Sequence, residues 1–152
     1  MKKLLYILFF VIEIIISCTK NGPAGKTDLL TAGKWQITEY TEICYCGGMG
    51  FSFGTSNRDV YASYAACERD NYYVFYKGGS AEVNEGATKC NPANAQSYPE
   101  GWAFNSDETR FQFKGKDWKI YQLNKTTFVI STVVLLGTGE TITFSKFIKS
   151  IP

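Results

Sequence analysis

The feature that most constrains this chain is the alternation of short apolar runs with turn residues from residue 33 onward. The runs are rich in β-branched and aromatic residues and are separated by Gly, Asn, Asp, Ser or Lys, the pattern of an all-β domain. No useful length of helical periodicity follows residue 32. The sequence therefore predicts eight strands, at residues 33–43, 71–77, 80–86, 101–105, 109–114, 118–124, 126–136 and 140–149.

Most loops between these predicted strands are short, which favours a single eight-stranded antiparallel up-and-down barrel, because closure leaves no exposed sheet edge. Residues 44–66 and 87–100 are expected to be rim loops instead of strands, with a short helical turn at 60–66. Rim loops of this kind commonly carry binding residues.

Aromatic residues make up 16% of the chain, and within the predicted strands they recur at every second position. Alternation directs such residues to one face of a sheet, so they are candidates for the barrel interior. They are Trp35, Tyr73, Phe75, Trp102, Phe104, Phe111, Phe113, Trp118, Phe128 and Phe144. Eight strands enclose space for side chains or for one small ligand, so a solid core and a cavity both remain open.

The N-terminus has the parts of an export signal. Two lysines precede residues 4–16, which are apolar apart from one glutamate and are shorter than the roughly 20 residues of a membrane-spanning helix. An isoleucine at position 15, small Ser17 and then Cys18 resemble the lipobox of bacterial lipoproteins. That resemblance implies cleavage before Cys18, a lipid on its thiol and a membrane-anchored location in the cell envelope. The alternative is an ordinary signal peptide followed by a cysteine that forms a disulfide.

This interpretation divides the chain into three parts. Residues 1–17 are the signal peptide, residues 18–32 are a flexible, lipid-anchored tether, and residues 33–149 are the barrel domain. The whole chain has a formal net charge of +2, and removal of the signal takes away two lysines and one glutamate. The mature protein is then close to neutral and has no basic field for nucleic acid, so nucleic acid is not an expected partner. The expected partner is a membrane, through the lipid on Cys18.

Export also places the remaining cysteines in an oxidising compartment. Cys67 precedes one predicted strand and Cys90 follows its hairpin partner, so strand pairing brings the two together, and we expect a Cys67–Cys90 disulfide. In an extended strand, Cys44 and Cys46 lie near the upper limit of Cα separation for a bond. A local Cys44–Cys46 disulfide and a pair of thiols both remain open.

The chain contains no histidine. It therefore lacks the commonest general base and the partner that activates serine or cysteine nucleophiles. Two neighbouring cysteines are half of a zinc site, and the sequence shows no second half. We therefore expect no enzymatic activity, no metal and no cofactor.

Two stretches carry a resemblance to a known family. Gly33-Lys34-Trp35 is similar to the Gly-x-Trp opening of lipocalins, in which the Trp closes one end of an eight-stranded barrel. Residues 67–111 resemble lipocalin-like lipoproteins of the Bacteroidota type. The matching positions are Cys67, Asp70, Tyr73, Phe75, Gly79, Glu85, Gly86, Lys89, Cys90, Trp102 and Phe104. The resemblance covers about residues 33–149 and implies a barrel, the Cys67–Cys90 bridge and an outer-membrane anchor.

The first functional expectation is a small hydrophobic ligand in the barrel or at its mouth. Its walls would be Tyr73, Phe75, Trp102, Phe104 and Phe113, with Tyr45 and Phe51 on a mobile lid. The alternative is a non-enzymatic interaction or inhibitor module with a filled barrel. It would bind an envelope protein through the loop tyrosines Tyr61, Tyr64 and Tyr98, because tyrosine-rich loops suit interfaces.

Overall fold

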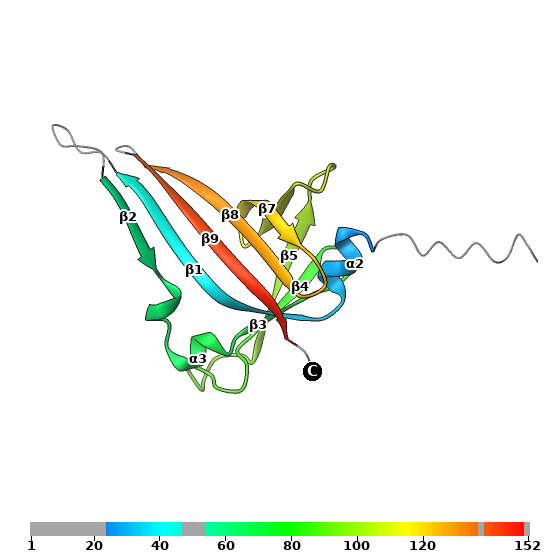
Figure 1. Cartoon of the computed structure of the whole chain (residues 1–152). Helices are drawn as coiled ribbons and strands as arrows, with labels where there is room; N and C mark the ends of the chain where they lie inside the picture. Colours follow the sequence, from blue (N-terminus) through cyan, green and yellow to red (C-terminus); the bar gives the residue numbers. More distant parts are fainter. Residues whose placement is uncertain (1–23, 47–53, 137–138, 151–152) are drawn as a thin grey trace, which may run out of the picture.

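A computed structural model describes residues 24–46, 54–136 and 139–150. At a few strand positions, among them Cys46 and Phe144, it describes the backbone alone. Within this part of the chain, nine strands form one antiparallel sheet (Figure 1). They are β1 (Lys34–Cys46), β2 (Gly54–Asp59), β3 (Tyr72–Phe75), β4 (Ser80–Asn84), β5 (Ser97–Phe104), β6 (Arg110–Phe113), β7 (Lys116–Leu123), β8 (Thr127–Leu136) and β9 (Gly139–Ser150).

Hydrogen bonds connect the strands in a ring. From β3 to β9 each strand pairs with the next, and β1 pairs with β3 at one edge and with β9 along almost its whole length at the other. β2 is outside this ring, because it pairs with residues 41–46 of β1 beyond the end of the short β1–β3 ladder. The all-β antiparallel prediction is therefore confirmed.

Alternating burial explains why these segments form strands. In β6 the exposed Arg110 and Gln112 alternate with the buried Phe111 and Phe113, so one face of the strand enters the core. The β6–β7 connection is a two-residue turn at Lys114 and Gly115, whose φ angles are +51° and +67°. Positive φ at both central residues matches the twist of the flanking strands.

The structure corrects the predicted extent of several strands. Residues 44–66 are not a single loop, because β1 continues through Cys46 and residues 54–59 form β2. β2 has the sequence GTSNRD, a polar stretch without alternating apolar residues. It is a strand because it pairs with β1, which the sequence pattern does not indicate. Residues 87–100 are likewise not all loop, since β5 begins at Ser97. The predicted helical turn is a 3-10 helix, η1 (Tyr61–Ser63), followed by α3 (Ala66–Arg69).

The predicted tether is also corrected at its C-terminal end. Residues 26–31 form the helix α2 (Lys26–Thr31), which lies against β3 and β7. Its Leu30 is fully buried, and the carbonyl oxygen of Leu30 accepts a 2.7 Å hydrogen bond from Nε1 of Trp35. Lys77 and Asp28 add a surface ion pair at 2.7 Å. The packed domain therefore begins at α2, before residue 33.

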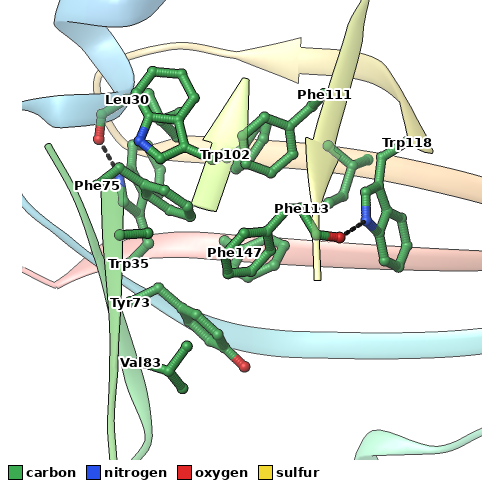
Figure 2. Packing of buried hydrophobic residues seen from close by; sticks show 13 residues of the cluster. Leu30, Trp35, Tyr73, Phe75, Val83, Trp102, Phe111, Phe113, Trp118 and Phe147 are labelled. Carbon is green, nitrogen blue, oxygen red and sulfur yellow. Dashed lines mark hydrogen bonds between the residues drawn. The ribbon is translucent and has the colours of Figure 1, made fainter. Parts of the chain in front are cut away.

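Aromatic side chains fill the ring near α2 (Figure 2). Trp35, Phe111 and Phe128 are each 0% exposed, and Phe75 is 1% exposed. Their rings meet edge-on, as in the pairs Phe75–Phe111 and Phe111–Phe128, whose centroids are 5.6 Å and 5.2 Å apart. Edge-to-face contacts of this kind are a favoured arrangement for aromatic rings.

The antiparallel order gives the ring two different ends. One, which we call the helix end, carries α2 and the turns at residues 76–79, 105–109 and 124–126. The other, the loop end, carries η1, α3, residues 85–96 and the Lys114–Gly115 turn. Beyond the loop end, β2, the C-terminal half of β1, the start of β9 and the end of β8 continue as a sheet extension (Figure 1). The β7–β8 ladder extends no further than Ser131, so residues 132–136 of β8 have register partners only on β9 within the described sheet.

Candidate functional site

A disulfide fixes one side of the loop end. Cys67 in α3 is bonded to Cys90 in the loop after β4, with a Cα–Cα distance of 5.1 Å and a sequence separation of 23. The predicted Cys67–Cys90 bridge is confirmed. Cys44 is also disulfide-bonded. The alternative of two thiols is therefore wrong, whereas the identity of the partner of Cys44 lies outside the described residues, because the side chain of Cys46 is not among them.

The acidic residue after α3 holds the same loop. Oδ2 of Asp70 accepts hydrogen bonds from the backbone N–H of Ala87 at 3.1 Å and of Thr88 at 2.8 Å. Gly86 makes this approach possible, because a Cβ at that position would lie 2.3 Å from the carbonyl oxygen of Asp70. The motif that carries the family resemblance therefore fixes the loop after β4 to the end of α3. We call this arrangement, the Cys67–Cys90 disulfide with the Asp70–Gly86 contact, the structural lock.

The five predicted wall residues do come together. Tyr73, Phe75, Trp102 and Phe113 are between 1% and 8% exposed, and Phe104 packs against them from the edge of the core. Phe75 contacts both Trp102 and Phe113 edge-on, at centroid distances of 6.0 Å and 5.3 Å. These side chains pack on one another, so in this region they form a solid core, and any wall they offer to a ligand is at its loop-end surface.

Tyr73 forms that surface at the loop end. Its ring borders a hollow of about 110 Å³, whose other lining residues are Ile37, Tyr64, Glu68 and Asn71. Burial raises the pKa of Tyr73 to about 12. Its hydroxyl is protonated at neutral pH, as in any ordinary tyrosine, and can donate a hydrogen bond.

Three further tyrosines stack beside this hollow. The ring of Tyr64 lies 6.2 Å from that of Tyr40 in a stacked arrangement and 5.7 Å from that of Tyr61. Burial raises the pKa of Tyr64 above its ordinary value as well. The hollow therefore has an aromatic side wall and phenolic donors, formed by β1 and the segment between β2 and β3.

A lysine lies over the same aromatic surface. Nζ of Lys114 is 5.3 Å from the ring centroid of Tyr73 and 6.0 Å from that of Phe113. Burial lowers the pKa of Lys114, and the charge of Glu100 opposes this effect. No described ion pair includes Lys114, so in the described part of the chain its ammonium group lies among aromatic rings without a carboxylate in contact.

A second and larger hollow adjoins Lys114 on the side of the ring. It has a volume of about 570 Å³ and lies between β5 and the β6–β7 turn, where β5 separates from its neighbour. Trp102 and Phe113 line it together with Lys114, Lys116 and Glu100. Lys114 therefore lines this hollow and also lies over the ring of Tyr73, which borders the small one.

Of the two residues expected on a lid, the structure describes one, Tyr45. Tyr45 lies on β1 ten positions beyond Trp35, which at β-strand rise is about 33 Å. Trp35 is the register partner of Tyr73, so the structure does not bring Tyr45 to the predicted walls. Phe51 lies outside the described residues. Of the loop tyrosines, Tyr98 is exposed, whereas Tyr61 and Tyr64 are half-buried in the stack described above.

Sequence reasoning missed Lys114, Ile37 and Asn71. Ile37 and Asn71 carry no pattern that separates them from ordinary strand and turn residues. Lys114 carries a usable signal, because it stands where a two-residue hairpin turn requires positive φ, a position that normally takes Gly, Asn or Asp.

A further hollow of about 530 Å³ lies over β7 and β8, with Arg110, Lys119, Tyr121 and Val133 among its lining residues. Among the described residues, no group of three or more His, Cys, Asp or Glu side chains is placed to hold a metal ion. In the same part of the chain, every helix is too short or too polar to cross a bilayer. No protein-family model matches this sequence, and no curated protein matches it.

Proposed function

We propose that the protein is a lipid-anchored, lipocalin-like envelope protein that binds a small ligand at the loop end of its ring. Three observations support the lipocalin-like barrel. Eight of the nine strands pair in a closed path, with β2 as an addition at the edge of β1. The Trp of the Gly-x-Trp opening, Trp35, is completely buried at the helix end. A helix preceding the first strand covers that end.

The observation that carries ligand binding is the contrast between the two ends of the ring. At the helix end, aromatic side chains fill the space completely. At the loop end, the same aromatic stack finishes in an unfilled hollow lined by Tyr73, Tyr64 and Ile37. Apolar walls with a few placed polar groups are typical of small-molecule sites. The role proposed is binding and not catalysis, since the chain has no histidine.

The position of α2 is compatible with an anchor at Cys18. The chain enters the domain at the helix end, and the eight residue steps from Cys18 to Lys26 span at most about 27 Å when extended. A lipid on Cys18 would therefore hold the helix end towards the membrane. The loop end, with its hollow, would face away from the bilayer and remain accessible.

A titration with N-phenyl-1-naphthylamine, a neutral aromatic probe, tests the proposed site. Emission of the probe should rise on binding, and Tyr64→Ala should weaken binding because it removes one wall of the hollow. The matched control is Tyr76→Ala, since Tyr76 is an exposed tyrosine beside the turn at the helix end. Equal losses in the two variants, or no binding to the wild-type protein, would contradict ligand binding at the loop end.

A second candidate function, an interaction module, is favoured by the sheet extension. Val133 and Leu135 are 50% and 81% exposed and lie on the face of β8 opposite to the core residues Phe128 and Ile130. Leu135 on β8 and Tyr45 on β1 are both register partners of residue 140 on β9, which lies between them, so the two lie on this same face. Contiguous exposed apolar patches mark interaction sites. Crosslinking in intact envelopes should then give an adduct that Leu135→Lys abolishes, and an unchanged adduct pattern would argue against this candidate.

A further inference from the structure

We propose that the loop-end site selects organic anions, with Lys114 binding the anionic head group of an aromatic or aliphatic ligand. This inference rests on the proposed ligand-binding function and assigns a ligand class to it. Its starting point is the position of one charged residue over an aromatic surface.

The backbone fixes Lys114 at the loop end. It occupies the first central position of the β6–β7 turn with a φ of +51°, and Gly115 follows at +67°. An L-residue other than Gly, Asn or Asp is unfavourable at such a position. The conformation of the turn therefore does not explain why a lysine occupies this position. A binding role for the lysine side chain explains it.

The side chain of Lys114 is exposed to solvent at the loop end, and it lies across the ring of Tyr73. Its ammonium nitrogen lies 5.3 Å from the ring centroid of Tyr73. A cation over an aromatic face is attracted to it, which helps to hold the ammonium group above Tyr73, where Lys114 also lines the larger hollow. Glu100 is close enough to act on Lys114 through its charge, but no ion pair joins them in the described structure.

The surroundings can complete an anion site. The hydroxyls of Tyr73 and Tyr64, which both line the small hollow, are protonated at neutral pH, as ordinary phenols are. They can therefore donate to a bound anion, while Lys114 supplies its charge. Hydrogen bonds that include a charged partner are the stronger kind.

Glu68 is the acidic residue in the lining of the hollow, and it is already engaged. Its Oε2 accepts a 2.7 Å hydrogen bond from the backbone N–H of Ala65 at the start of α3. Its carboxylate is therefore directed to the helix start.

The volume of the hollow fits a head group better than a whole ligand. It is about 110 Å³, whereas drug-sized ligands occupy roughly 300–1,000 Å³. The body of the ligand must then lie outside it. The hollow of about 570 Å³, lined by Lys114, Trp102 and Phe113, is large enough to receive that body.

Two probes that share an aromatic body and differ in charge test this inference. 1-Anilinonaphthalene-8-sulfonate carries a sulfonate, and N-phenyl-1-naphthylamine is its neutral counterpart. The variant is Lys114→Asn, because Asn removes the charge and still accepts positive φ. The matched control is Lys119→Asn, since Lys119 also lies over a tyrosine, at 5.0 Å from the ring centroid of Tyr121, but on exposed β7. Circular dichroism confirms that each variant is folded.

We expect Lys114→Asn to weaken sulfonate binding by about tenfold or more, the order expected for loss of a charge-assisted contact, and to change binding of the neutral probe by less than about twofold. Lys119→Asn should change neither. If Lys114→Asn leaves sulfonate binding unaltered, or weakens both probes alike, the anion assignment is wrong although the ligand site stands. If neither probe binds the wild-type protein, the proposed function itself fails.

Discussion

Gly86→Ala tests the structural lock at the loop end. A Cβ on Gly86 would lie 2.3 Å from the carbonyl oxygen of Asp70 and 2.8 Å from its Cγ, and its φ is +67°. The left-handed backbone costs about 1–2 kcal/mol for a residue with a Cβ. Relieving the clash moves the turn away from Asp70, and the two hydrogen bonds from Ala87 and Thr88 are each worth about 0.5–1.5 kcal/mol. We expect the free energy of unfolding to fall by about 3–4 kcal/mol.

Gly115→Ala is the matched control. Gly115 has the same φ of +67°, but a Cβ there would meet no atom within 4 Å. Its replacement should therefore cost only the backbone part, about 1–2 kcal/mol. Urea unfolding followed by tryptophan fluorescence measures both variants. A difference between them of less than about 0.5 kcal/mol would refute the claim that Asp70 and Gly86 form a tight structural contact.

Three further predictions address the disulfide, the buried tyrosine and the anchor. Replacing Cys67 and Cys90 by Ala should lower the free energy of unfolding by about 3 kcal/mol, since a loop of this length is released, and an unchanged urea midpoint would contradict this. Burial raises the pKa of Tyr73 to about 12, above the value of about 10 in the unfolded chain. The free energy of unfolding should therefore be unaffected by this group below about pH 10 and fall by about 3 kcal/mol as the pH rises from 10 to 12. Tyr73→Phe should remove that part of the alkaline slope in urea unfolding, and an identical slope would count against the burial. Cys18→Ser should move the protein from the membrane fraction to the soluble fraction, and retention in the membrane would exclude a lipid anchor at Cys18.

The strands of the ring could be predicted from the sequence because each buries one face. Segments such as 109–114 carry an alternating aromatic pattern that only a half-buried strand explains. β2 could not be predicted in this way, since GTSNRD is polar on both faces and is exposed where its side chains are described. Pairing along the long edge of β1 decides its conformation, and that pairing is a tertiary contact.

The candidate site was predicted only in part for a similar reason. Alternation places Phe75 and Phe113 on the inner face in a filled core and in a hollow barrel alike, so the pattern cannot distinguish them. α2 has six residues, too few for a periodic signal, and its role depends on the contact between Leu30 and Trp35. Lys114 is placed by the geometry of a turn, which brings its ammonium group over the ring of Tyr73 on β3.

Native mass spectrometry of the protein, isolated from the envelope without lipid-stripping detergent, tests ligand binding most directly. The account predicts a discrete added mass that disappears on denaturation and is reduced in Tyr64→Ala but not in Tyr76→Ala. A mass that equals the processed chain with its disulfides, with nothing added, would contradict a retained ligand at the loop end. The sheet extension would then be the surface to pursue.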